Sequence, residues 1–385
     1  MPHQAKSWFL YPGTGRDMGQ LADLVQEDFE LRDIADGELL TEPLYGCWGA
    51  NMIHAMTRKP VDICKQRGED RVVLGNAGVV RVLEVGRGVS GFRPGQLGMI
   101  FSASVLDPFG YPEKALAYDA PGTMGCLSTR IILRPHEIVP IPENTRHSLP
   151  QWAAFSGSYV TAWSNWAQAY GSLRLLLSKD ELPSPHVWGW GGGTTLAELD
   201  LARRHGCATV MLSASDTRLG LIAATGITPL DRRQFGELNY EERRFATDAA
   251  YRRAYLDAEA KFLREVDQRT SGAKVHIFID YIGTPVTRVT LKALGRQGVI
   301  TTAGWREGMV MSYLRAVECI GRHQHVHTHY ARYPQGIEAV AYGEAEGWMP
   351  CVDERIYGFD EIPELARRSF AGDVGFYAVF SVNTP

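Results

Sequence analysis

The clearest pattern of hydrophobic and polar positions lies between residues 186 and 212. An apolar run at residues 186–188 leads into four glycines within five positions, and apolar residues at helical spacing follow from Leu196 onward. The helical pattern stops at Gly206, and a second apolar run begins at Ala208. Because the hydrophobic period changes from that of a strand to that of a helix and back, the segment predicts a strand–turn–helix–strand (βαβ) unit.

The rest of the chain divides into β-rich and mixed regions. Short apolar runs between residues 38 and 96, separated by glycines and prolines, predict a compact β-rich domain, and residues 5–10 predict a strand before it. Apolar runs at residues 275–283 and 298–304 predict two more buried strands after the βαβ unit. Residues 234–266 look helical and heavily charged. A length of 385 residues suits two domains.

Composition narrows the class of protein. Hydrophobic residues make up 45% and charged residues 22% of the sequence, as in ordinary globular proteins. A formal net charge of −4 gives no broad electrostatic case for nucleic acid binding. Because no apolar run reaches membrane-spanning length and the first residues lack a signal-peptide core, we expect no membrane association and a cytoplasmic location. The six cysteines have no close pairs, which fits reduced thiols and excludes a local Cys-x-x-Cys zinc site.

The glycine-rich turn has the chemistry of a diphosphate site. Glycines let the backbone approach the diphosphate of a dinucleotide, and the helix that follows supplies unpaired N–H groups and the positive end of its dipole. A tight turn without a ligand is the alternative interpretation of the same residues. Thr194 stands where the third fingerprint glycine would pack the helix on the strand, so we expect a slightly displaced helix. The predicted cofactor-binding residues of this segment are Gly189, Gly191, Gly192, Gly193, Thr194 and Thr195.

The residue type at the end of the second strand of the βαβ unit indicates whether the protein binds NAD or NADP. An NAD site usually has an Asp or Glu there, which binds the ribose 2′-hydroxyl. Ser213 stands at this position instead, and Ser215 and Arg218 follow it. Hydroxyl groups and a guanidinium suit a 2′-phosphate, so NADPH is the predicted cofactor. The alternative is that Arg218 belongs only to the solvated face of the next helix.

Residues 75–95 carry the pattern Gly-x-x-Gly-Val-Val-x-x-x-x-Val-Gly-x-Gly-Val-x-x-Phe-x-Pro-Gly, and the glycine-rich βαβ unit follows later. Together these features resemble the medium-chain dehydrogenase/reductase superfamily, from about residue 40 to residue 380. The resemblance implies an α/β fold, with a GroES-like β-rich catalytic domain and a Rossmann domain built on a doubly wound parallel sheet. The active site would then lie in the cleft between the domains.

The resemblance also implies where the domains begin and end. The catalytic domain is expected at residues 1–155 and 335–385, and the NADP-binding Rossmann domain at residues 156–334. The charged segment near residues 234–266 resembles an insertion in crotonyl-CoA carboxylase/reductase relatives. A homodimer is the assembly that the resemblance implies.

Zinc-binding members of this superfamily usually carry Gly-His-Glu where this chain has glycine followed by Asn76 and Ala77. The four-cysteine zinc loop is missing too, so the resemblance implies a zinc-free member. Asn51 matches an asparagine of the family and is a candidate for positioning the substrate or the nicotinamide ribose. His54 and Cys47 are candidate proton donors. The alternative for His54 is a purely structural role, in which its side chain only makes hydrogen bonds within its loop.

Further candidates match the part of the family fold that borders the nicotinamide. Thr161, Tyr281 and Gly304 are predicted to bind the cofactor there. His323 ends a segment that resembles Ile-Gly-Ser-His in carboxylating enoyl-thioester reductases, and it is the fourth candidate catalytic residue. The alternating histidines that follow suit either a metal ion or a polar edge strand, and we favour the edge strand; they are His325, His327 and His329.

The resemblance predicts a zinc-independent, NADPH-dependent oxidoreductase. It would transfer a hydride to an enoyl thioester, carried by coenzyme A or an acyl carrier protein, or to a related enone. Without a zinc ion as Lewis acid, conjugate reduction needs only an oxyanion-stabilising hydrogen bond and a proton source. The crotonyl-CoA relatives carry a carboxylate just before the glycine at the Gly125 position; residues 121–123 have none, which favours protonation over CO2 capture.

Three alternatives stay open. The first is an oxidoreductase that acts on a quinone or on a ketone of specialised metabolism. The second is a reductive carboxylase of the crotonyl-CoA type. The third is a protein that binds NADPH without turnover.

Overall fold

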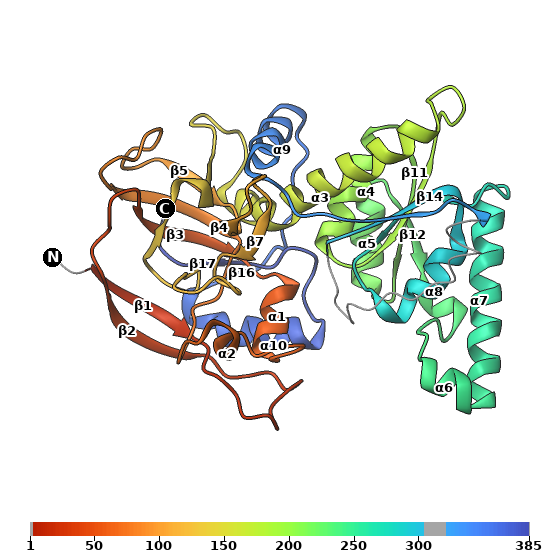
Figure 1. The fold of residues 1–385 in the computed structure, drawn as a ribbon, viewed down its shortest axis with the longest axis horizontal. Coiled ribbons are helices and arrows are strands. Elements are labelled where there is room, and N and C mark those ends of the chain that lie inside the picture. The colour runs from red at the N-terminus through yellow and green to blue at the C-terminus, as the bar shows by residue number, and fades with distance from the viewer. Residues whose placement is uncertain (1–2, 304–320, 385) are drawn as a thin grey trace. The chain divides into compact units, whose positions relative to one another are not determined.

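The computed structural model describes residues 3–303 and 321–384. The chain divides into two compact units, one made of Met1–Val160 with Ala331–Pro385 and the other of Thr161–Tyr330. We call the first the split unit and the second the central unit. In Figure 1 the split unit runs from red to yellow and returns in blue. Within the described ranges, no helix is long and apolar enough to cross a bilayer.

A seven-stranded, mostly antiparallel sheet forms the centre of the split unit (Figure 1). Its hub is β3 (Leu39–Cys47), which pairs with β4 (Gly78–Val85), β8 and β17. The strands run in the order β16, β17, β3, β4, β5 and β9, and β8 lies beside β3. The other strands of this sheet are β5 (Leu97–Ile100), β8 (Ile131–Leu133), β9 (Ile138–Pro140), β16 (Ile356–Tyr357) and β17 (Val379–Ser381).

Two smaller hairpins complete the β structure of the split unit. In the first, β1 (His3–Phe9) pairs with β2 (Val25–Leu31), so the strand predicted from residues 5–10 is confirmed. In the second, β6 (Ala103–Leu106) pairs with β7 (Pro112–Ala115). The GroES-like, β-rich half of the predicted fold is therefore confirmed.

The helices of the split unit cover its sheets, and large aromatic side chains lie in the core of the unit. Trp48 and Phe380 pack edge to face with ring centres 6.5 Å apart, and Tyr159 lies 4.6 Å from Trp348. Such pairs bury large apolar areas in a defined geometry. These helices are α1 (Ala50–Met56), α2 (Ile63–Arg67), the first half of α3 (Leu149–Leu176), α9 (Tyr333–Glu346) and α10 (Ile362–Ala371), with 3₁₀ turns at Pro135–Glu137 and Phe359–Glu361.

The central unit is built on a six-stranded parallel sheet in the order β12, β11, β10, β13, β14 and β15. This is the doubly wound order of a dinucleotide-binding domain, and it confirms the Rossmann half of the predicted fold. The strands are β10 (His186–Trp190), β11 (Ala208–Ser213), β12 (Thr228–Asp231), β13 (Val275–Asp280), β14 (Leu294–Thr302) and β15 (His325–Thr328).

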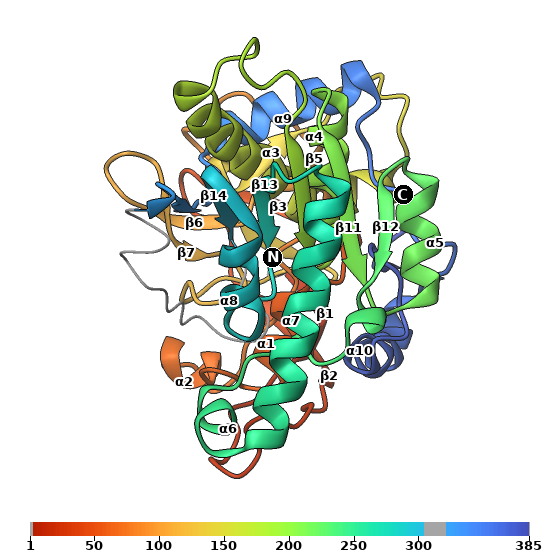
Figure 2. The same cartoon turned by 90° about the vertical axis from the view of Figure 1, so that its right-hand side faces the viewer.

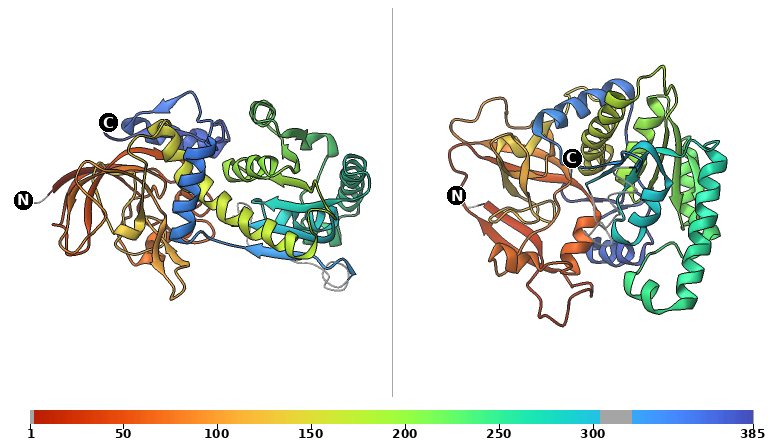
Figure 3. Two further views of the ribbon diagram at one scale, coloured as in Figure 1. Left: turned by 90° about the horizontal axis from the view of Figure 1, so that it is seen from above. Right: turned by 45° about the vertical axis from the view of Figure 1, so that its right-hand side comes forward.

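Helices cover both faces of this sheet, as Figures 1, 2 and 3 show. The crossovers from β10 to β11 and to β12 use α4 (Gly193–Arg204) and α5 (Asp216–Ala224) on one face. The crossovers that lead to β13 and β14 use α7 (Ala249–Arg269) and α8 (Thr284–Ala293) on the other face. Because parallel crossovers are right-handed, a reversal of direction along the sheet moves the helices to the opposite face. The central strands are therefore covered on both faces, which explains why β13 is buried at every position.

The charged segment predicted as helical contains a 3₁₀ turn (Arg232–Phe235), α6 (Glu242–Thr247) and α7. Apolar residues of α7 at helical spacing, such as Tyr255 and Phe262, are fully buried. One carboxylate of this helix is buried as well: Glu259 pairs with Arg288 at 3.3 Å and with Lys292. The segment is therefore fixed on α8 by ion pairs to a buried carboxylate in addition to its apolar face.

Candidate functional site

A glycine-rich turn at the carboxyl end of β10 joins this strand to α4. Gly191 has a φ of +151°, and a Cβ there would lie 2.2 Å from Thr195 Oγ1 and 3.0 Å from Tyr281 Cβ. A side chain therefore cannot fit on the inner side of the turn. Gly192 is the N-cap of α4, and a Cβ there would meet no atom within 4 Å in the part of the chain that the structure describes. The turn is thus tightly packed at Gly191 and open where the helix begins.

The turn lies where the order of strands along the sheet reverses. The crossover after β10 leads to β11 on one side, and the crossover after β13 leads to β14 on the other. In open parallel sheets, ligands bind at the carboxyl ends of the strands at such a switch point. Because α4 begins here without an acidic residue in its first turn, its N–H groups and dipole favour an anion such as a diphosphate.

Thr195 makes a close contact between α4 and β10. Thr195 is fully buried, and a Cβ on Gly189 would lie 2.7 Å from its Cγ2. Its Oγ1 also donates a hydrogen bond to the Trp190 carbonyl oxygen at 3.4 Å. Thr194 is half-exposed. The displaced helix expected from Thr194, and the role of Thr194 in binding the cofactor, stay predictions.

The three polar residues predicted to bind a 2′-phosphate meet at the start of α5. Ser213 is the last residue of β11, and its Oγ accepts a hydrogen bond from the Ser215 backbone N–H at 3.2 Å. Ser215 caps the helix, because its Oγ accepts from the Arg218 backbone N–H at 3.5 Å. The two serines and the Arg218 backbone thus form one hydrogen-bonded turn at the carboxyl end of β11, which pairs with β10. Their role in binding phosphate stays a prediction.

A second arginine lies at this corner, and the sequence pattern gave no sign of it. Arg233 follows β12, and its guanidinium donates to Asp231 at 2.8 Å and also to Asp216. The hydrogen bond from Arg233 holds the pKa of the Asp216 carboxyl below its usual value. The carboxylate next to Ser215 is therefore already paired, which reduces its repulsion of a phosphate.

At the predicted nicotinamide end, the structure describes two of the three candidates. Tyr281 follows β13, and its backbone N–H donates to the Trp190 carbonyl at 3.2 Å. Its hydroxyl is used inside the unit, because it donates to Glu198 Oε2 at 3.1 Å and accepts from Asn165 Nδ2 at 2.6 Å. Thr161 lies on α3 and is half-buried. Gly304 lies outside the described residues.

A pair of side-chain amides lies in the split unit. Asn51 is in the first turn of α1, and its Nδ2 donates a hydrogen bond to Asn76 Oδ1 at 3.0 Å. The loop before Asn76 is fixed by Gly75, which has a φ of +104° and whose carbonyl accepts from the Cys126 N–H at 2.7 Å. Both amides are half-buried, and each carries two N–H groups, so donors remain beyond their mutual bond. Such donors can stabilise negative charge on a substrate oxygen.

The two candidate proton donors near this pair differ in access. His54 lies three residues after Asn51 on α1, is half-buried, and therefore shares a helix face with it. Cys47 ends β3 and is only 6% exposed. Burial, aided by the charge of Asp353, raises the pKa of the Cys47 thiol to about 12. The structure thus leaves Cys47 poorly placed for proton transfer to a substrate, and we leave it out of the proposal below.

His323 lies at the wrong edge of the parallel sheet for the predicted role. It is exposed and precedes β15, so it lies at the amino-terminal edge, whereas the glycine-rich turn lies at the carboxyl edge. His329 follows β15 and so lies at the carboxyl edge. His325 and His327 stack with ring centres 6.3 Å apart, which agrees with one face of an edge strand. Across residues 3–303 and 321–384, no three His, Cys, Asp or Glu residues gather as metal ligands would.

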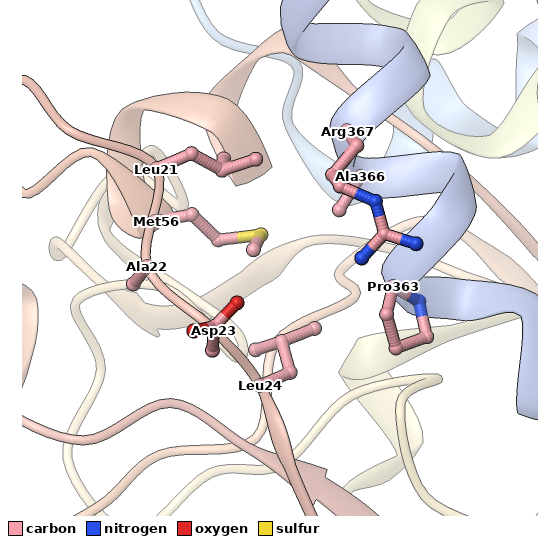
Figure 4. A pocket seen from close by; sticks show the side chains of 8 residues that line it. All are labelled: Leu21, Ala22, Asp23, Leu24, Met56, Pro363, Ala366 and Arg367. Atoms are coloured by element: carbon pink, nitrogen blue, oxygen red, sulfur yellow. The ribbon is translucent and has the colours of Figure 1, made fainter.

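Two features of the split unit were not predicted. Near the segment where the crotonyl-CoA relatives carry a carboxylate, Glu69 accepts from the Gly122 N–H at 2.7 Å and is paired with Arg67 at 2.8 Å. A small surface hollow also lies beside α10 (Figure 4). None of the predicted site residues lines it, since its walls are Leu21, Ala22, Asp23, Leu24, Met56, Pro363, Ala366 and Arg367.

Solved structures of similar fold cover the whole chain. The crotonyl-CoA carboxylase/reductase AntE in complex with NADP has a TM-score of 0.81 and 19% identity, over 100% of this chain and 96% of that chain. The 2-octenoyl-CoA carboxylase reductase CinF, in complex with NADP and 2-octenoyl-CoA, has a TM-score of 0.80 and 17% identity, over 99% of this chain and 88% of that chain. A cinnamyl alcohol dehydrogenase from Sorghum bicolor has a TM-score of 0.72 and 16% identity, over 100% and 99% of the two chains.

No family model matches the sequence, and no curated protein matches it. The likeness to solved structures is therefore a likeness of fold. The chain has the fold that crotonyl-CoA carboxylase/reductases and alcohol dehydrogenases share, as its resemblance to the medium-chain dehydrogenase/reductase superfamily predicts.

Proposed function

We propose that this protein is an NADPH-dependent oxidoreductase. The observation that carries the proposal is the glycine-rich turn at the switch point of the sheet, which is open at Gly192 and leads into the N-terminus of α4. The NADP complexes among the structures of similar fold support it. When bound, NADPH supplies the hydride, and the turn would hold its diphosphate.

The preference for NADPH over NADH is proposed from the corner of Ser213, Ser215 and Arg218. Replacing Arg218 by alanine should weaken NADPH binding by about 10- to 150-fold, because a charge-assisted hydrogen bond contributes about 1.5–3 kcal/mol. NADH binding should stay the same, since NADH has no 2′-phosphate. The measurement is the Kd of both dinucleotides by fluorescence titration, with the exposed Arg252→Ala as control. An unchanged ratio of the two affinities in Arg218→Ala would contradict the assignment.

For the reaction, we infer conjugate reduction of an enoyl thioester. The side chains at positions 76 and 77 are an amide and a methyl group, neither of which is a ligand that zinc prefers. The Asn51–Asn76 pair would instead donate hydrogen bonds to the thioester oxygen, which gains negative charge when a hydride is added at the β-carbon. His54, on the same helix face as Asn51, would return a proton to the α-carbon directly or through a water molecule. Hydride and proton together give the saturated thioester.

Protonation is proposed over carboxylation. Capture of CO2 would need groups that hold it and exclude water. The carboxylate near Gly122 is that of Glu69, which is already paired with Arg67. His323 does not assist either, because it precedes the amino end of β15.

The function is tested by following NADPH absorbance with crotonyl-CoA, 2-octenoyl-CoA and a quinone, followed by mass spectrometry of the products in labelled bicarbonate. We expect NADPH oxidation with an enoyl-CoA and a reduced product without label. A labelled product would favour the reductive carboxylase, and turnover of the quinone alone would favour the quinone oxidoreductase. Tight NADPH binding without any turnover would point to a non-catalytic protein, and no NADPH binding at all would refute the proposal.

A further inference from the structure

A buried carboxyl group lies in the central unit, and no ion-pair partner for it is among the residues that the structure describes. Glu198 of α4 is fully buried, and its Oε2 accepts a hydrogen bond from the Tyr281 hydroxyl at 3.1 Å. Its Oε1 makes no hydrogen bond within the ranges that the structure describes, and no cation there forms an ion pair with it. An isolated buried carboxylate is costly, so burial raises the pKa of Glu198 well above its usual value.

The surrounding groups are matched to a neutral acid. Asn165 of α3 is fully buried, and its Nδ2 donates to the Tyr281 hydroxyl at 2.6 Å. Its Oδ1 is the second polar atom of the cluster without a partner among the described residues. A protonated Glu198 carries an O–H donor, whereas a carboxylate offers only acceptors. The neutral form therefore adds an O–H donor to a cluster in which a carboxylate would add only another acceptor.

The same cluster supports the glycine-rich turn. A Cβ on Gly191 would lie 3.0 Å from Tyr281 Cβ, and the Tyr281 N–H is bonded to the Trp190 carbonyl just before the turn. The Tyr281 hydroxyl is in turn bonded to Glu198, on the helix that the turn begins, and to Asn165 of α3. Tyr281 thus links the turn with α3 and α4 at once.

Charge gives a second reason for the neutral form. Glu198 is in the second turn of α4, whose N-terminus is the proposed diphosphate site. A negative charge buried behind this N-terminus would cancel part of the positive potential that the helix end presents to the diphosphate and would repel the diphosphate, since buried charges are little screened. A neutral acid keeps the hydrogen bond to Tyr281 without this repulsion.

We infer that Glu198 is a neutral carboxylic acid that, through Tyr281, positions the glycine-rich turn for the diphosphate of NADPH. The inference rests on the proposed function for the identity of the ligand. Glu198 acts as a positioning residue, because its contacts are with Tyr281 and not with the cofactor.

The test compares Glu198→Gln with Glu198→Leu. Glutamine is always neutral, and its carbonyl can accept from Tyr281, so its Kd for NADPH should stay within about twofold of the wild type. Leucine has no acceptor, and Tyr281→Phe has no hydroxyl, so both should weaken NADPH binding by about tenfold, the effect of one hydrogen bond. The matched control is Tyr255→Phe, which removes a 3.3 Å bond from a buried tyrosine to Glu259 on α7 and should leave the Kd unchanged.

Infrared spectroscopy gives a readout that a merely structural role would not change. The wild type at pH 7 should show the C=O band of a buried carboxylic acid, which Glu198→Gln lacks. A carboxylate band for Glu198, or a Glu198→Gln protein that binds NADPH as weakly as Glu198→Leu, would overturn the inference. If the wild type binds no NADPH, the proposed function and the positioning role both fail, and the band still decides whether the acid is neutral.

Discussion

An alanine at position 192 should weaken NADPH binding by roughly 100-fold while the protein keeps its folded stability. Gly192 has a φ of −113°, which other residues can adopt, and a Cβ there meets no described atom within 4 Å. The methyl group would therefore not disturb the protein itself. It would occupy the space through which the diphosphate approaches the backbone N–H groups at the start of α4. The measurements are the NADPH Kd and the free energy of unfolding in urea.

Variants at two other glycines distinguish an effect on NADPH binding from an effect on folded stability. Gly191→Ala should lose both binding and stability, because its Cβ would lie 2.2 Å from Thr195 Oγ1 at a φ of +151°. Gly171 lies inside α3, near its C-terminal end, with no described atom within 4 Å of a Cβ, so Gly171→Ala should bind NADPH normally and be more stable by about 0.5–1 kcal/mol. If Gly192→Ala binds NADPH as tightly as the wild type, the diphosphate does not bind at this turn.

Replacing Asn76 by alanine should lower kcat for an enoyl thioester by about 10²- to 10³-fold, the usual effect of losing one oxyanion donor. Asn76 is bonded to Asn51 at 3.0 Å, so the same loss is expected for Asn51→Ala. The NADPH Kd should not change, because the residues proposed to bind the cofactor are in the central unit. The measurements are steady-state kinetics with an enoyl-CoA that turns over and the NADPH titration.

A double-mutant cycle sharpens this prediction. If the two amides act as a pair, Asn51→Ala with Asn76→Ala should cost little more than either change alone, since groups that act together are not additive. The exposed Asn144→Ala is the control. A kcat within twofold of the wild type in both single variants would mean that another group stabilises the oxyanion.

Much of the fold was predictable from the hydrophobic period and the glycine positions of short stretches of sequence. The βαβ unit is visible in the sequence because an apolar strand, a turn of glycines and a helical period follow one another within 30 residues. The buried strands β13 and β14 are visible as apolar runs for the same reason, since each element is specified by its own neighbours. Such patterns also indicated the end of the second strand, where Ser213 and Ser215 form one local turn.

The tertiary structure alone decided which distant side chains meet and on which side they lie. Cys47 and His323 are candidates from the sequence, but whether a side chain is buried, or at which edge of a sheet it lies, depends on the strands around it. Thr195 contacts Gly189 because the contact between helix and strand depends on the rotation of α4.

The sequence by itself determined a dinucleotide-type parallel sheet with a glycine-rich turn and a β-rich partner unit, because hydrophobic period and glycine placement act over short stretches of chain. Only the tertiary structure brought Asn51 to Asn76 and joined Glu198, Tyr281 and Asn165. These groups come from separate elements, and no local pattern encodes the packing that brings them within hydrogen-bond distance.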